Sequence, residues 1–163
     1  MSLLTPTFLQ LRMLLVALSV FVTGIAFSQG EESALEMVRK LHLGQNLGIM
    51  SYELSKATTT YQGIAANVGY QKADELLKRE LESAVLQHQA QWDKNLARAW
   101  APLMTPGELE SVTSEKRESP YAAKFLSFQN QAGTTMKADS ENLLITITTE
   151  ALTKALEKSL DQK

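Results

Sequence analysis

The two histidines, His42 and His88, have the widest chemical range of any side chains in this 163-residue chain. A histidine can act as an acid or base near neutral pH, or as a metal ligand. His88 lies on an apolar stripe with Trp92 one helical turn further on, so the two side chains are candidates for contacting a ligand in a helical pocket. The alternative is a histidine at the edge of the core with one ring nitrogen satisfied. A di-iron helical bundle places a glutamate three residues before the histidine, and Val85 stands there, so the sequence predicts no metal at His88.

Other catalytic signatures are absent from the sequence. The chain has no cysteine, which excludes disulfides, thiolate metal sites and a cysteine nucleophile. Hydrolase and nucleotide-binding motifs such as G-x-S-x-G, H-E-x-x-H and the P-loop do not occur. Paired acids such as Glu80 with Glu82, or Glu108 with Glu110, are two residues apart and would point to different sides of a helix. His42 follows a helical segment, where a cation suits the helix dipole. We therefore expect a protein that is not an enzyme and needs no cofactor.

The first 28 residues are typical of a secretory signal peptide. Arg12 is their only charged residue, an apolar run covers residues 13–25, and small residues occupy the −3 and −1 positions of a cleavage site between Ser28 and Gln29. This run is shorter than the roughly 20 residues that a membrane-spanning helix needs, although an uncleaved membrane anchor is the alternative. The sequence thus predicts a bacterial periplasmic protein without stable membrane insertion after cleavage.

Removal of the leader leaves a mildly acidic chain. The full chain has a net charge of −2, and without Arg12 it has 15 basic and 18 acidic residues, a net charge of −3. Nucleic-acid binding requires a basic patch, so we expect no nucleic-acid partner.

The candidate residues must be positioned by helices. The longest predicted helix covers residues 70–103. Apolar or aromatic residues recur there at helical spacing, with His88 among them: Ala73, Leu77, Leu81, Ala84, His88, Trp92, Leu96, Ala99 and Leu103. The eight steps of this stripe span 30 residues, a mean of 3.75. A repeat longer than 3.6 residues makes the apolar face drift around the helix. We therefore expect Leu77 and Leu81 to pack on the segment before this helix, and Trp92 and Trp100 on the segments after it, including Phe125 and Phe128.

Two helices are predicted before the long one. Residues 29–44 contain the capping-box pattern Ser33 to Glu36 and end at Gly44. Residues 45–69 are predicted to form one helix with a heptad seam, made up of Leu47, Met50, Leu54, Ala57, Tyr61, Ile64 and Val68.

Three shorter helices are predicted after it. Thr105 is the expected N-cap of a helix over 104–118, Ser119 with Pro120 opens a second, and Asp139 or Ser140 caps a third. Residues 143–149 alternate as a strand would, but a single strand has no partner. The sequence thus predicts an all-α bundle of about six helices, with residues 29–163 forming one helical domain.

Part of this pattern resembles a known family, the domain of unknown function 2059. The matching residues are Thr105, Glu108, Leu109, Ser119 and Pro120. The resemblance covers about residues 92–152 and implies an exported, all-helical periplasmic protein of a family without an established activity. The chain departs from the family pattern where Lys116 and Arg117 replace an aromatic pair and where Ala122 replaces a glycine.

Our leading hypothesis is a non-enzymatic periplasmic protein that binds or scaffolds another periplasmic protein or a second copy of itself. The alternatives are a small enzyme or ligand-binding protein that uses His88, and a membrane-anchored protein that retains its leader. Convergence of His88 and a carboxylate on one concave pocket would favour the enzyme.

Overall fold

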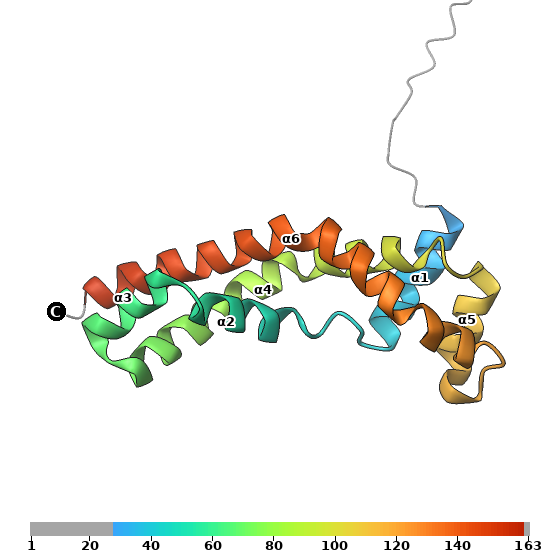
Figure 1. The fold of residues 1–163 in the computed structure, drawn as a ribbon, viewed down its shortest axis with the longest axis horizontal. Helices are drawn as coiled ribbons and strands as arrows, with labels where there is room; N and C mark the ends of the chain where they lie inside the picture. Colours follow the sequence, from blue (N-terminus) through green and yellow to red (C-terminus); the bar gives the residue numbers. More distant parts are fainter. Residues whose placement is uncertain (1–27, 162–163) are drawn as a thin grey trace, which may run out of the picture.

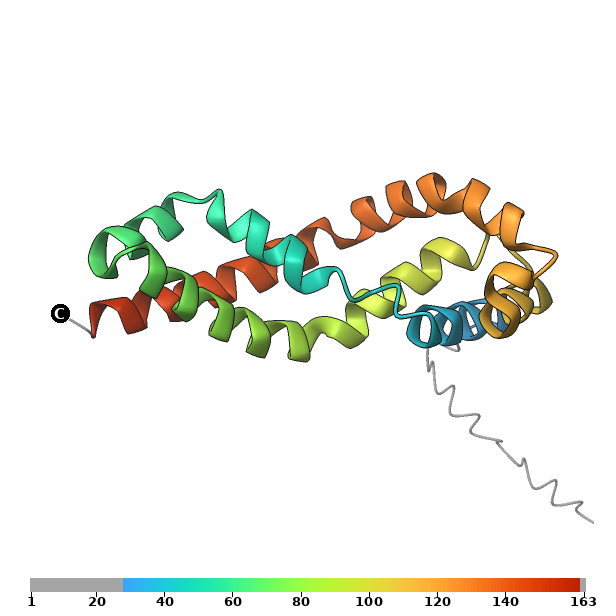
Figure 2. The same cartoon turned by 90° about the horizontal axis from the view of Figure 1, so that it is seen from below.

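The computed structural model describes residues 28–161, and this part of the chain is all-α, as the sequence predicts. The elements in chain order are α1 (Gln29–Lys40), α2 (Leu47–Lys56), α3 (Thr59–Val68), α4 (Tyr70–Trp100), α5 (Pro106–Glu115), the short 3-10 helix η1 (Lys116–Glu118) and α6 (Ala122–Leu160). The bundle is elongated, and α4 and α6 run side by side along it (Figures 1 and 2). Residues 1–27, nearly all of the predicted leader, lie outside the described range. No helix in the described range is long and apolar enough to cross a membrane.

The long helix predicted over 70–103 is α4, which has 31 residues. It starts after Gly69, whose φ of 82° is a conformation that glycine adopts readily. Its predicted stripe is buried at Ala73, Leu77, Leu81, Ala84, Trp92 and Ala99. The helix ends at Trp100, three residues before the predicted boundary at Leu103.

The partition of the chain on either side of α4 differs from the prediction. Residues 45–69 are not one helix, because the chain breaks between α2 and α3. The Thr58 hydroxyl accepts a hydrogen bond from the Tyr61 amide and donates one to the Ser55 carbonyl, and such local bonds compete with helix continuation. The predicted heptad seam is buried at Leu47, Tyr61 and Ile64. It is wrong at Met50 and Leu54, which are 39% and 37% exposed. The buried face of α2 consists of Leu47, Ser51 and Ser55.

The last two predicted helices are a single helix, α6, of 39 residues. Ser140 is not a cap but a buried residue within α6. Its hydroxyl lies 3.0 Å from Asn95 Nδ2, which donates a hydrogen bond to it from α4. The predicted stop at Asp139 or Ser140 is therefore wrong, because the serine is satisfied by a neighbouring helix and not by the start of a new one. The strand alternative for residues 143–149 is wrong as well, since they are helical.

Two predicted helix boundaries in the first segment are wrong. Ser28, not Ser33, caps α1 by accepting a hydrogen bond from the Glu31 amide, and Ser33 is buried inside the helix. The helix ends at Lys40, and His42 has a positive φ of 56° in the following turn. Gly44 serves a different purpose from the predicted stop, because a Cβ there would collide with the Asp93 carboxylate.

The two ends of α4 have different neighbours, but the predicted division between the segments before and after it is only partly right. Lys158 of α6, which follows α4, binds Glu80 in its first half, and Gly44, which precedes α4, lies beside Trp92 in its second half. Tyr61 of α3 bonds Asp74 near the start of α4, whereas Gly44, after α1, accepts a hydrogen bond from Gln89 further along. Trp100 stacks on Phe125 of α6 with ring centroids 4.3 Å apart. The predicted contact between this end of α4 and Phe125 is thus confirmed, with Trp100 as the stacking partner.

Candidate functional site

The two ligand candidates predicted from the sequence, His88 and Trp92, have different surroundings. His88 is half-buried, and its Nε2 lies 3.0 Å from a carboxylate oxygen of Glu150 on α6. Trp92 belongs to the buried core, and its Cδ1 lies near Gly44. Its indole Nε1 is buried and has no hydrogen-bond partner within the described residues.

The His88–Glu150 pair does not form one concave site. Glu150 lines a shallow hollow of about 530 Å³ on α6 together with Thr149, Thr153 and Lys154, but His88 is not among the residues that line it. What the pair does is join α4 to α6 on the side of the bundle. Between residues 28 and 161, no group of three or more histidines or acids is placed to hold a metal ion.

The five residues of the family pattern serve as caps, core and turn. Thr105 and Glu108 form the predicted capping box at the start of α5, with the Thr105 amide donating to Glu108 at 2.9 Å. Glu108 also accepts bonds of 2.7 Å from Lys124 of α6. These bonds, from Lys124 first and the Thr105 amide second, hold the pKa of Glu108 below its ordinary value of 4.5. Leu109 is fully buried.

Ser119 and Pro120 lie in a turn and not at the first helical positions, because α6 starts at Ala122. The Ser119 hydroxyl accepts a bond from the Tyr121 amide and lies 2.8 Å from the Ser111 hydroxyl. The three positions that depart from the family pattern, Lys116, Arg117 and Ala122, all line one hollow beside this turn.

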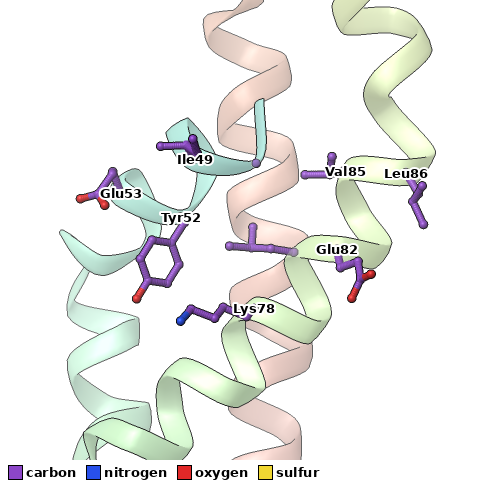
Figure 3. A pocket seen from close by; sticks show the side chains of 9 residues that line it. Ile49, Tyr52, Glu53, Lys78, Glu82, Val85 and Leu86 are labelled. Carbon is purple, nitrogen blue, oxygen red and sulfur yellow. The ribbon is translucent and has the colours of Figure 1, made fainter. Parts of the chain in front are cut away.

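A groove between α2 and α4 is the best candidate for a binding site (Figure 3). Its volume is about 550 Å³, within the range of ligand sites. The lining residues on α2 are Gly48, Ile49, Tyr52 and Glu53, and those on α4 are Lys78, Leu81, Glu82, Val85 and Leu86. Ile49 and Leu86 are 69% and 76% exposed. Large apolar side chains are thus presented to solvent on both walls of the groove.

Tyr52 lines the groove with a ring whose orientation is fixed by two neighbouring lysines. Its ring has two ammonium groups beside it, Lys56 Nζ at 5.2 Å and Lys78 Nζ at 5.5 Å from the centroid. Lys56 also donates a hydrogen bond of 3.3 Å to the Tyr52 hydroxyl, and this bond is the main reason that the pKa of Lys56 is raised. Cation–π contacts and this hydrogen bond favour one orientation of the ring, so this wall is formed before any ligand arrives.

A partly buried polar contact holds Lys56, the lysine that lies beside Tyr52. The Tyr61 hydroxyl donates a bond of 2.6 Å to Asp74, and Lys56 lies 3.6 Å from the same carboxylate. Burial first, and then the bond to Asp74, raises the pKa of Tyr61 to about 12. The same bond lowers the pKa of Asp74. This contact ties α3 to α4 and keeps Lys56 between Asp74 and Tyr52.

Sequence reasoning did not identify the groove. The heptad assigned Met50 and Leu54 to the core, so Ile49 fell outside the predicted seam and received no role. Leu86 also lies off the α4 stripe, between Val85 and Gln87. The sequence signal that could have identified the groove is that Ile49 and Leu86, both large and apolar, lie outside the two predicted stripes.

Comparison of the chain with protein-family models, with curated proteins and with solved structures finds no match. The resemblance of Thr105–Pro120 to the domain of unknown function 2059 therefore stays a prediction based on those residues alone.

Proposed function

We propose that this protein is a non-enzymatic periplasmic binding module whose α2/α4 groove receives an amphipathic helix of a protein partner. The observation that carries the proposal is the exposure of Ile49 and Leu86 on opposite walls of a concave, largely apolar surface. Contiguous exposed apolar surface on a protein marks an interaction site more often than isolated apolar residues do. His88 joins α4 to α6 through Glu150 and does not line the groove, so the proposal assigns it a structural contact.

The shape of the groove favours a helical partner. Two neighbouring helices, α2 and α4, form its walls (Figure 3). A helix that lies in such a groove inserts apolar residues at positions i, i+3 or i+4, and i+7. The flanks of that helix should carry more basic than acidic residues, because two acids line the groove, Glu53 on α2 and Glu82 on α4, against one lysine, Lys78. Neither acid is in an ion pair within residues 28–161.

Gly48 allows a direct test, because a Cβ added there would meet no atom within 4 Å. The variant Gly48→Leu should fill the groove and abolish capture of the partner from a periplasmic extract. Its free energy of unfolding should not fall, since leucine has a higher helix propensity than glycine by up to about 1 kcal/mol. Denaturation curves of variant and parent check this second point.

Gly63 provides the matched control. It lies inside α3, and a Cβ there also meets no atom within 4 Å, but Gly63 does not line the groove. Gly63→Leu should capture the same partner as the parent protein. Equal capture by all three proteins, or loss of capture by both variants, would rule out the groove as the binding site.

We also propose that export ends with cleavage between Ser28 and Gln29. Small residues at the −3 and −1 positions support this cut. The intact mass of protein recovered from the periplasm should equal that of residues 29–163. A mass that includes the leader would favour the membrane-anchored alternative.

A further inference from the structure

A second hollow, of about 460 Å³, lies where α5 and η1 meet the start of α6. It is separate from the α2/α4 groove and shares no lining residue with it. Its apolar part is formed by Leu41, Val112, Phe125 and Leu126, and two basic residues, Lys116 and Arg117, also line it. Leu126 is 62% exposed. The hollow therefore combines an apolar surface with two positive charges.

The two basic side chains have no carboxylate partner in the described part of the chain. No ion pair there involves Lys116 or Arg117. The flanking acids do not line the hollow, and one of them, Glu115, accepts a hydrogen bond of 2.7 Å from Ser111. In a chain with a net charge of −2, an apolar hollow with two unpaired cations is complementary to a ligand that is both apolar and anionic.

The backbone conformation of Lys116 is consistent with a binding role for the two basic residues in the hollow. Its φ and ψ of 56° and −117° form a conformation that favours glycine. Strained residues of this kind cluster at binding and catalytic sites. Here the Lys116 amide donates a hydrogen bond to the Val112 carbonyl and ends α5. The sharp change of direction lets two successive residues, Lys116 and Arg117, both line the hollow.

We propose that this hollow binds a free amphipathic carboxylate, with the acid group at Lys116 and Arg117 and the hydrocarbon chain against Phe125 and Leu126. A charge-assisted hydrogen bond from either cation is stronger than a neutral one. The concave apolar surface provides burial for a single chain, which favours a free ligand over a flat membrane surface. The proposal does not depend on the partner proposed for the α2/α4 groove.

Titration calorimetry with three probes that share an unbranched ten-carbon chain, decanoate, decanol and decyltrimethylammonium, tests the proposal on the whole protein. Decanoate should bind at least tenfold more tightly than decanol, and the cationic probe should bind most weakly. The double variant Lys116→Gln/Arg117→Gln should lose at least tenfold in affinity for decanoate and keep its affinity for decanol. Leu126→Asn should weaken the binding of both probes.

The control variant Lys137→Gln/Lys154→Gln removes the same charge from exposed positions of α6 outside this hollow. It should bind decanoate as the parent does, and so should Gly48→Leu. Equal affinity of the parent for decanoate and decanol would overturn the proposal, as would an equal loss in the control variant. Binding to vesicles of anionic phospholipid that requires Lys116 and Arg117, without binding of decanoate, would identify a membrane contact and also overturn it.

Discussion

The two ends of the bundle use the same pair of long helices in different ways. At the α1/α5 end, Trp100 of α4 stacks on Phe125 of α6, and Glu108 of α5 binds Lys124 of α6. At the α2/α3 end, buried leucines of α4 lie beside a polar contact in which Tyr61 donates to Asp74. Each end has an open apolar hollow, one lined by two acids and one lysine, Lys78, and the other by two cations.

This difference shows how one helix pair can support two unlike surfaces. α4 and α6 supply the common core, while the shorter helices add charges of opposite sign to the two hollows. In α2, the chain presents Glu53 to the groove, and in η1 it presents Lys116 and Arg117 to the second hollow. If both proposals hold, a basic helix binds at one end and a carboxylate at the other.

Truncation of a core side chain at each end should lower the free energy of unfolding more than any other change proposed here. Leu77→Ala at the α2/α3 end and Trp100→Ala at the α1/α5 end should each cost about 3 kcal/mol or more in the free energy of unfolding. Both side chains are buried, with 0% and 4% exposure. Chemical denaturation measures these losses, and they should add in the double variant, because distant sites act independently.

A double-mutant cycle sharpens this comparison. Phe125→Ala should couple to Trp100→Ala by about 0.5–1.5 kcal/mol, the usual strength of an aromatic pair, and should not couple to Leu77→Ala. Coupling of Phe125 to Leu77 would show that the two ends are not independent.

Tyr61→Phe should make the α2/α3 end less sensitive to alkali. The pKa of Tyr61 is raised from 10.0 to about 12 in the folded protein. The neutral phenol therefore stabilises the fold fully below pH 10, and this contribution is lost as the pH rises to 12. The variant should lose about 1–2 kcal/mol at pH 7, because Asp74 loses a hydrogen bond, and should show a smaller loss of stability between pH 10 and 12.

The exposed tyrosine at the other end, Tyr121, is the control for this measurement. Unfolding of Tyr121→Phe should follow the pH dependence of the parent protein. If Tyr61→Phe also follows the parent, the buried phenol does not contribute to alkaline unfolding.

Thr105→Ala should destabilise the α1/α5 end by about 1 kcal/mol, the usual contribution of an N-cap hydroxyl. Thr105 accepts from the Glu108 amide and completes the capping box. Denaturation of variant and parent gives the difference. No loss would mean that α5 is held by Leu109 and the Glu108–Lys124 pair without its cap.

Lys116→Gly should have the smallest effect and the opposite sign, a gain of about 0.5–1 kcal/mol. Glycine removes the energetic cost of the positive φ at this position. Its greater conformational entropy in the unfolded chain offsets part of this gain in stability. Thermal unfolding measures the change. A loss of stability would mean that contacts of the Lys116 side chain outweigh the backbone cost.

Much of the helical pattern was predictable from spacing, and the exceptions have a common cause. The stripe of α4 is regular over 30 residues, so its helix and the contact of its last turn with Phe125 followed from the sequence. The break at Thr58 and the continuity at Ser140 did not. Both depend on where a hydroxyl finds its hydrogen-bond partner, locally at Ser55 for Thr58 and on another helix, at Asn95, for Ser140.

The candidate sites were less predictable than the helices. A hollow consists of surface that no element covers, so it depends on the packing of the whole bundle. Exposure of Ile49 depends on which face α2 turns to the core, and that face is set by Leu47, Ser51 and Ser55. Periodicity alone favoured the face with Met50 and Leu54.

The length of α6 has a hydrodynamic consequence. At 1.5 Å per residue, its 39 residues extend about 58 Å, roughly twice the diameter of a small globular domain. An elongated particle has a larger frictional coefficient than a sphere of equal mass. A monomer of this protein should therefore elute early in gel filtration and resemble a dimer there, and only sedimentation equilibrium or light scattering will report its true association state.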